Sequence, residues 1–320
     1  MASQPTLVIA VGGGHKAAQP WVAAFAERLP GWIVVPQGTE ADPATVRHLV
    51  SWRHPHRSLA VYTGARAIFS LGAGVDHIIA DPELPPVPIV RIVDPDLTAR
   101  MSEWVMLHVL RHHRQVTRYE RQQAATTWSD DDWQPAARDV RVGVMGLGVL
   151  GRDAAVKLAT IGFDVAGWSR TGTTIPGIAC FAGAEQRQAF LQRTQILVVL
   201  LPLTPATRGI LDATLFGELA RDGHCGGPIV LNAGRGGLQV EADILRSLDD
   251  GTLKAVTLDV FETEPLPAAS RLWSHPGVTI TPHNAAISNP DAIADRIARQ
   301  ILAYERGEPL QDVVDPARAY

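Results

Sequence analysis

Three glycines, Gly146, Gly148 and Gly151, have the spacing G-x-G-x-x-G near the middle of the sequence. The apolar segment 140–145 before them predicts a strand, and the segment 149–161 predicts a helix that begins inside the motif. At such a turn the first glycine bends the backbone, the second lets a ligand approach it, and the third lets helix and strand pack closely. The N–H groups at the start of the helix then suit a pyrophosphate. The motif therefore predicts a dinucleotide-binding site, with an ordinary glycine-rich loop as the alternative.

The side chains after the next predicted strand, 164–168, bear on which dinucleotide binds. An acidic residue at this point would accept hydrogen bonds from the 2′-hydroxyl of the ribose. The sequence has Ser169, Arg170 and Thr171 there instead. A guanidinium with two neighbouring hydroxyls suits a 2′-phosphate, because arginine forms charge-assisted and often bidentate bonds to phosphate oxygens. The sequence predicts NADP(H) in preference to NAD(H), unless Arg170 is only a solvated loop cation.

Polar side chains also follow three later apolar segments, each predicted to be a strand. Arg235 lies in an Asn-Ala-Gly-Arg-Gly-Gly loop, Asp259 and Glu264 follow the next strand, and His283 ends a Thr-Pro-His triplet. A dinucleotide fold binds its reactive ring at the carboxyl ends of its strands. These side chains are therefore the candidates for chemistry. Each also has a structural interpretation on its own, such as a solvated turn residue or a loop cap.

In this combination the protein resembles the D-isomer-specific 2-hydroxyacid dehydrogenases. Their pattern includes a central G-x-G-x-x-G, an arginine in an N-x-x-R-G loop, a glutamate before proline, and a T-P-H triplet, and all four are present in order. The resemblance covers nearly the whole sequence, and the segment 70–76 looks like the carboxylate-binding loop of the family. The segments 168–170, 264–267, 272–273 and 314–320 are most similar to the branch that reduces glyoxylate and hydroxypyruvate.

The resemblance implies NADPH-dependent reduction of a small 2-keto acid to a 2-hydroxy acid. His283 would give the proton, since the ordinary pKa of histidine, about 6.5, allows both protonation states near neutrality. Glu264 would orient the imidazole and favour its charged form. Arg235 would clamp the carboxylate and the carbonyl oxygen, an effect on the order of 3 kcal/mol in comparable sites. Asp259 would bind the nicotinamide end, and Glu262 is expected outside the site.

The family pattern also implies which residues bind the cofactor and which bind the substrate. The expected cofactor contacts are Gly146, Gly148, Val149, Leu150, Gly151, Ser169, Arg170, Thr171, Leu201, Pro202, Thr207, Ala233, Asp259 and Ala285. The expected substrate contacts are Trp52, Leu71, Gly72, Ala73, Gly74 and Arg235, with the backbone N–H groups of Ala73 and Gly74 on the carboxylate. Apolar packing is an equal alternative for Trp52.

No metal site is expected. His108 and His112 have a metal-ligand spacing, but the glutamate of an H-E-x-x-H motif is absent, and a place on the helix surface is favoured. Asn284 departs from the apolar residue commonly found in the family beside the histidine. Two alternatives stay open: a nucleotide-sensing interaction protein on the same fold, and a dehydrogenase of another D-2-hydroxy acid.

The elements that must position these residues predict an α/β protein of two domains. A doubly wound Rossmann cofactor domain, 100–285, is inserted in a flavodoxin-like substrate domain made of 1–99 and 286–320. A long helix is expected from Ser102 to about Gln123, and the last helix, 290–306, is expected to pack on the first domain. The other predicted elements are strands 6–11, 32–35, 67–71, 89–92, 140–145, 164–168, 196–200, 229–232, 255–259 and 278–280, and a helix at 21–29.

Composition narrows the possible partners and location. A protein of 320 residues with 46% hydrophobic residues can bury a large core, and a net charge of −4 provides no footprint for nucleic acid. The cluster 52–57 is interpreted as a solvated loop, because it contains a proline and two histidines. Two cysteines and no long apolar segment predict a cytoplasmic protein without a membrane anchor. The resemblance implies a homodimer formed through the region 102–123.

Overall fold

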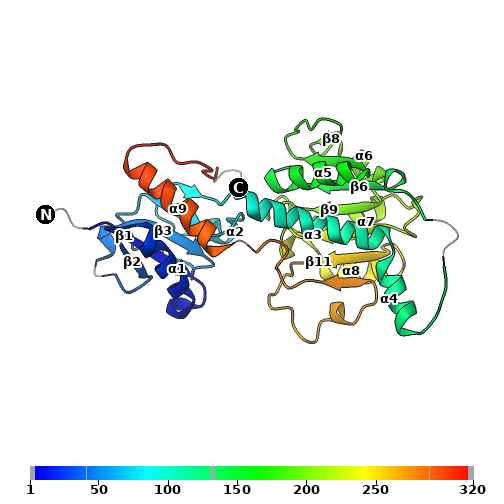
Figure 1. Ribbon diagram of the computed structural model, residues 1–320, viewed down its shortest axis with the longest axis horizontal. Coiled ribbons are helices and arrows are strands. Elements are labelled where there is room, and N and C mark those ends of the chain that lie inside the picture. The colour runs from blue at the N-terminus through cyan, green and yellow to red at the C-terminus, as the bar shows by residue number, and fades with distance from the viewer. Residues whose placement is uncertain (1–3, 41, 131–133, 288, 316–320) are drawn as a thin grey trace. The chain divides into compact units, whose positions relative to one another are not determined.

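The computed structural model describes residues 4–40, 42–130, 134–287 and 289–315. These residues form two compact units (Figure 1). The described residues before Thr98 and after Ile287 make the first unit, and the described residues of Thr98–Ile287 make the second. Among the helices of the described residues, none is long and apolar enough to span a membrane.

The first unit contains a five-stranded parallel sheet in the order β2-β1-β3-β4-β5. This is the flavodoxin-like order, which follows when the backbone winds first to one side of β1 and then to the other. The central strand β3 was not predicted, because its sequence is interrupted by Arg47 and His48. The strands are β1 (Thr6–Val11), β2 (Ile33–Pro36), β3 (Val46–Trp52), β4 (Ala67–Ser70) and β5 (Ile89–Val90).

Helices α1 (Gly14–Arg28) and α9 (Pro290–Glu305) lie together on one face of this sheet (Figure 1). Phe25 of α1 and Ile297 of α9 are buried in the same cluster as Leu7, on β1. The last helix therefore packs on the first unit, as expected from its position after the final strand. The opposite face is covered by residues that include Ile78 of the short helix α2 (Asp76–Ile79) and by loops.

The second unit contains a seven-stranded parallel sheet in the order β12-β11-β10-β9-β6-β7-β8. The order reverses between β6 and β9, which makes a topological switch point at the carboxyl end of β6. The doubly wound α/β architecture expected from the sequence is confirmed, although β8 was not predicted. The strands are β6 (Arg141–Met145), β7 (Asp164–Ser169), β8 (Ala179–Ala182), β9 (Ile196–Val199), β10 (Ile229–Asn232), β11 (Ala255–Leu258) and β12 (Val278–Ile280).

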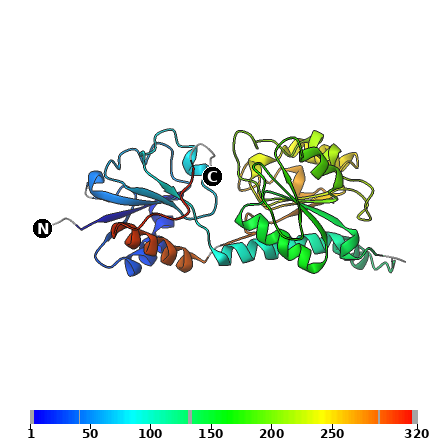
Figure 2. The ribbon, with the colours of Figure 1, turned by 90° about the horizontal axis from the view of Figure 1, so that it is seen from above.

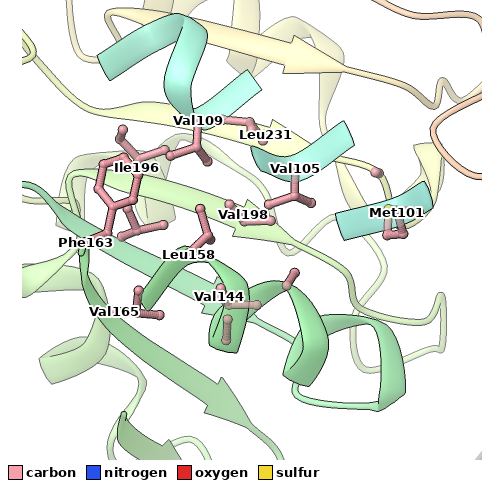
Figure 3. Close-up of a cluster of buried hydrophobic side chains, with 14 of the residues drawn as sticks. Met101, Val105, Val109, Val144, Leu158, Phe163, Val165, Ile196, Val198 and Leu231 are labelled. Atoms are coloured by element: carbon pink, nitrogen blue, oxygen red, sulfur yellow. The ribbon is translucent and has the colours of Figure 1, made fainter. Parts of the chain in front are cut away.

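Both faces of the second sheet are covered by helices, which explains the continuous apolar runs of its strands. Val144 and Val198 meet Leu158 of one helix and Val105 of another on the first face (Figure 3). Figure 2 shows these helices, cyan α3 and green α5, along one side of the sheet. The helices of this face are α3 (Pro95–His113) and α5 (Val149–Ile161), and those of the other are α6 (Arg187–Arg193), α7 (Ala213–Glu218) and α8 (Glu241–Asp249).

The single helix expected from Ser102 to Gln123 is wrong in its bounds. α3 begins earlier, at Pro95, and ends at His113, and a separate helix α4 (Val116–Ala124) follows. The break falls at Gln115, whose φ of 54° lies in the left-handed region. Short 3₁₀ segments complete the elements: η1 (Pro43–Thr45), η2 (Ala137–Asp139), η3 (Gly236–Leu238) and η4 (Arg271–Trp273).

Candidate active site

The glycine motif forms the turn between β6 and α5, and its three glycines serve different purposes. Gly146 has a φ of 108°, and a Cβ there would meet the carbonyl of Leu200 at 2.8 Å. A Cβ on Gly151 would lie 1.8 Å from the carbonyl oxygen of Gly146, so the helix could not approach the strand. Gly148, the N-cap of α5, has no atom near its Cβ position and no side-chain cap. The space beside Gly148 and the start of α5 therefore fit the pyrophosphate of a dinucleotide.

The polar side chains predicted to bind the adenosine ribose of the dinucleotide lie at the end of β7. The Ser169 Oγ is buried and has no hydrogen-bond partner among the described residues. Arg170 and Thr171 are exposed beside it. Arg152, in the first turn of α5, reaches the same loop, where its Nη2 donates to the Thr173 Oγ1 at 2.9 Å and to the Thr174 carbonyl at 3.1 Å. Arg152 was missed in the sequence, although its place directly after the motif could have indicated it.

The loop after β9 is closed by its own hydrogen bonds. The Thr207 Oγ1 donates to the Pro202 carbonyl at 2.7 Å and accepts from the Thr204 N–H at 2.8 Å. Leu201, at the start of this loop, is buried. The hydroxyl of Thr207 therefore holds the loop together, and its contact with the cofactor stays a prediction.

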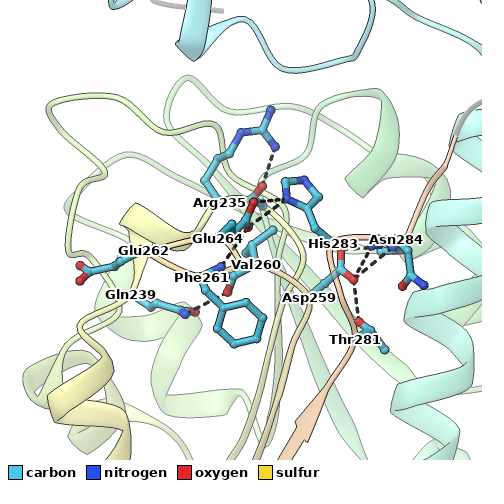
Figure 4. Close-up of polar contacts among 12 residues, drawn as sticks. Arg235, Gln239, Asp259, Val260, Phe261, Glu262, Glu264, Thr281, His283 and Asn284 are labelled. Atoms are coloured by element: carbon cyan, nitrogen blue, oxygen red, sulfur yellow. Dashed lines mark hydrogen bonds and ion pairs between the residues drawn. The ribbon is translucent and has the colours of Figure 1, made fainter. Parts of the chain in front are cut away.

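A hydrogen bond joins the two carboxyl-end loops that carry Glu264 and His283 (Figure 4). The His283 Nδ1 lies 2.8 Å from the Glu264 Oε2. Because a carboxylate only accepts, the Nδ1 carries the hydrogen. The imidazole Nε2 makes no hydrogen bond with the described residues and is the ring nitrogen left for a ligand. The side chain of Glu262 extends away from this pair (Figure 4), as expected for a residue outside the site.

The Arg235 loop is shaped by the buried side chain of Asn232. The Asn232 Oδ1 accepts from the Gly234 N–H at 3.0 Å, and its Nδ2 donates to the Arg235 carbonyl at 3.1 Å. A Cβ on Gly236 would lie 1.9 Å from the Phe261 carbonyl oxygen, so glycine lets this loop pack on the loop that leads to Glu264. Hydrogen bonding and packing within the protein therefore explain the asparagine and the last glycine of the N-x-x-R-G pattern. The arginine is the residue for which substrate binding is predicted.

Asp259 lies at the end of β11 and is almost fully buried, with 1% of its surface exposed. Its carboxylate accepts from the Thr281 Oγ1 at 2.6 Å and from the backbone N–H groups of Asn284 and Ala285 at 3.0 and 3.2 Å. The sequence suggested a contact with the nicotinamide end, which stays a prediction. What the structure adds is that Asp259 holds the loop around His283.

In the first unit the proposed substrate loop packs under an indole ring. A Cβ on Gly72 would lie 2.4 Å from the Trp52 Cζ3, so only glycine leaves room for this ring. Trp52 is also in edge contact with His77, at 4.6 Å between centroids. The Ser70 Oγ donates to the Gly74 carbonyl at 3.1 Å and shapes the turn. Leu71 is buried, and Ala73 and Gly74 are half-buried.

The interpretation of 52–57 as a solvated loop is wrong for His54. Its side chain is 0% exposed, with Nε2 at 3.0 Å from the Asp81 Oδ2 and Nδ1 at 2.6 Å from the Ser51 Oγ. Burial lowers the pKa of His54, so the neutral ring donates to Asp81 and accepts from Ser51. This Ser-His-Asp arrangement is closed to solvent and serves to join the loop to β3.

The expected place of His108 on the helix surface is also wrong. His108 is 5% exposed and packs against Trp104 in a tilted ring contact, at 4.5 Å between ring centroids. Four residues on, the His112 Nε2 lies 2.8 Å from the Thr257 Oγ1. Both rings fill space between α3 and the sheet. Within the described ranges, no cluster of three or more metal-binding side chains occurs.

Comparison with known proteins relates this chain to one family of dehydrogenases. The model of the D-isomer-specific 2-hydroxyacid dehydrogenase NAD-binding domain matches residues 106–285. A glyoxylate/hydroxypyruvate reductase A of Serratia proteamaculans is 42% identical over 95% of this chain and 96% of its own length. The chain belongs to the D-isomer-specific 2-hydroxyacid dehydrogenase family and is an NAD(P)-dependent oxidoreductase.

Two solved structures match this chain over nearly its whole length. A probable 2-hydroxyacid dehydrogenase of Rhizobium etli, in complex with NADP, HEPES and L(+)-tartaric acid, has a TM-score of 0.92 and 42% identity over 99% of this chain and 100% of the other. An NADPH-dependent glyoxylate/hydroxypyruvate reductase of Sinorhizobium meliloti, in complex with NADP and sulfate, has a TM-score of 0.90 and 46% identity over the same shares.

Proposed function

We propose that this protein reduces small 2-keto acids, such as glyoxylate and hydroxypyruvate, to 2-hydroxy acids with NADPH. The observation that carries the proposal is the hydrogen bond of 2.8 Å between Glu264 and the His283 Nδ1, which leaves the Nε2 for a substrate oxygen. Support comes from the relatives, two of which are named for glyoxylate and hydroxypyruvate and one of which was solved with an organic dicarboxylic acid.

The protein groups would act on the keto acid as follows. Bound NADPH would supply the hydride to the carbonyl carbon. His283 would protonate the carbonyl oxygen through the Nε2, while Glu264 stabilises the charged imidazole. Arg235 would bind the carboxylate and the developing negative charge on the oxygen. In the first unit, the backbone N–H groups of Ala73 and Gly74 would bind the carboxylate, and Trp52 would line the substrate site.

The cofactor would lie along the carboxyl end of the second sheet. Gly146, Gly148 and Gly151 would hold the pyrophosphate against the start of α5. Ser169, Arg170 and Thr171 would bind the adenosine ribose and its 2′-phosphate, with NADPH preferred over NADH. The other proposed cofactor contacts are Val149, Leu150, Leu201, Pro202, Thr207, Ala233, Asp259 and Ala285.

Absorbance at the NADPH band tests the proposal directly. We expect purified protein to oxidise NADPH with glyoxylate or hydroxypyruvate, and His283→Ala to lower kcat by about 100-fold or more. Asn284→Ala, at the exposed neighbouring residue, measures how much of that loss comes from altering the loop alone. Absence of turnover with every small keto acid, together with tight NADPH binding, would favour a nucleotide-sensing role.

We also propose that the protein is a homodimer formed through the region 102–123. Leu107 of α3 is 62% exposed, and α4 has no buried residue among those described. Apolar side chains and an unburied helix are typical of a surface covered by another subunit. Light scattering tests this proposal, and a monomeric mass would contradict it.

A further inference from the structure

A series of hydrogen bonds connects helix α3 with the loop that carries His283. The Trp104 Nε1 lies 3.1 Å from the Thr281 Oγ1, and that oxygen lies 2.6 Å from the Asp259 Oδ1 (Figure 4 shows the second contact). An indole N–H only donates, and a carboxylate only accepts. The Thr281 hydroxyl must therefore accept from Trp104 and donate to Asp259, so the direction of every hydrogen in the series is determined.

Asp259 in turn holds the loop on both sides of His283. Its backbone carbonyl accepts from the His283 N–H at 2.8 Å, and its carboxylate accepts from the N–H groups of Asn284 and Ala285. A buried carboxylate is costly unless such partners are present. Among the described residues, the Thr281 hydroxyl is the one side-chain hydrogen-bond partner of this carboxylate, and Trp104 sets its orientation.

His283 has a backbone conformation that needs this support. Its φ of 52° lies in the left-handed region, which is unfavourable for a residue other than glycine. Such a conformation persists only where the surroundings determine it from several sides. Here the neighbours of His283 are bound to a single buried side chain, while its own ring is bound to Glu264.

We propose that Thr281 and Trp104 are positioning residues for His283, which act through the carboxylate of Asp259. The proposal rests on the proposed function, because it assigns two more residues to the same site. Replacing Thr281 by valine keeps the shape but leaves the Trp104 N–H and a lone pair of Asp259 without a partner. The loop can then relax, and a displacement of about 1 Å at a reacting group costs about 100-fold in rate.

Four variants test the proposal by steady-state kinetics with NADPH and glyoxylate. We expect Thr281→Val to lower kcat by about 10- to 100-fold with little change in the KM for NADPH. Thr281→Ser restores the hydroxyl and most of kcat, and Trp104→Phe, which keeps an aromatic ring against His108, results in an intermediate loss. Thr279→Val, on β12 and outside the hydrogen-bonded series, keeps the wild-type rate. Wild-type kcat in Thr281→Val, or no rescue by serine, would overturn the proposal.

A measurement without turnover separates this proposal from the proposed function. The hydrogen on the His283 Nδ1 bonds to Glu264 and should give a downfield imidazole proton signal in NMR spectra, assigned by its absence in His283→Gln. We expect Thr281→Val to weaken or shift this signal, while Thr281→Ser and Thr279→Val keep it. If wild-type protein reduces no keto acid, the proposed function fails, and an unchanged signal in Thr281→Val still refutes positioning. If Thr281→Val does not fold, the same two readouts on Trp104→Phe decide.

Discussion

Both carboxylate oxygens of Glu264 lie within hydrogen-bond distance of one ring nitrogen of His283, at 2.9 Å for Oε1 and 2.8 Å for Oε2. Oε1 also accepts from the Phe261 N–H at 3.2 Å, which fixes the carboxylate relative to its own loop. The imidazole is therefore oriented by a group that is itself held by the backbone. A substitution of Glu264 that keeps its shape and removes its charge therefore tests what the charge contributes.

Replacing Glu264 by glutamine keeps a hydrogen-bond acceptor for the Nδ1 but removes the negative charge. Since the imidazole then loses the negative charge beside its Nδ1, we expect kcat to fall by about 100-fold. Steady-state kinetics with NADPH and glyoxylate measure this loss. Glu262→Gln, at an exposed carboxylate on the same loop, is the matched control and should retain the wild-type kcat. Equal kcat values for the two variants would contradict the role of Glu264.

Gly148→Ala should separate cofactor binding from folding. No atom lies within 4 Å of the added Cβ, and the φ of Gly148 is −68°, so alanine fits the free protein at a cost below about 1 kcal/mol. The new methyl group would occupy the space proposed for the pyrophosphate, and we expect the Kd for NADPH to rise at least about tenfold. Fluorescence titration and a thermal midpoint measure the two quantities.

The matched control for this variant is Gly217→Ala on α7, where a Cβ also meets nothing within 4 Å. Gly217 is not among the proposed cofactor contacts, and its substitution should leave the Kd for NADPH unchanged. If Gly148→Ala binds NADPH as tightly as the wild type does, the proposed path of the pyrophosphate is wrong.

Arg170→Ala should lower the preference for NADPH over NADH. A hydrogen bond to a charged group contributes about 1.5 to 3 kcal/mol, so we expect the ratio of kcat/KM values to fall by about 10- to 100-fold, with little change for NADH. Arg152→Ala should cause a smaller decrease in the same direction, because Arg152 reaches the same loop from α5. Arg138→Ala, at an arginine with 82% of its side chain exposed, controls for the loss of a surface charge. A parallel loss with both cofactors would contradict recognition of the 2′-phosphate.

His48 makes the stability of the first unit depend on pH. Its side chain is 0% exposed, and burial lowers its pKa to about 4, although a hydrogen bond to Glu305 acts in the opposite direction. Below pH 6.5 the unfolded protein binds a proton that the folded protein does not, so stability is complete above this pH and falls as the pH drops toward 4. The loss amounts to about 3 kcal/mol.

Urea unfolding at several pH values between 7.5 and 4 measures this loss. His48→Phe keeps an aromatic ring between Trp32 and Phe69 but cannot take up a proton. We expect the variant to show a shallower decline of stability over this range, whatever its stability at neutral pH. An unchanged slope would mean that other groups cause the decline.

The glycine turn and most of the strands could be inferred from the sequence, because they depend on local patterns. Gly146, Gly148 and Gly151 have a spacing that only a strand, turn and helix in succession require, and apolar runs such as Ile196–Val199 mark strands covered on both faces. The resemblance that pointed to Arg235, Glu264 and His283 rests on short motifs of the same local kind. These features can be recognised without knowledge of distant contacts.

The tertiary structure decided which polar residues are buried and what they bind. His54 and His48 look like surface residues in the sequence, yet Asp81 and Glu305 bind them inside the first unit. Strand β3 was missed because the burial of His48 depends on that partner on α9. Likewise Asp259 was interpreted as a ligand group, and only the fold brings Thr281 to its carboxylate. Burial of a polar group depends on a partner distant in the sequence, and a local pattern does not specify that partner.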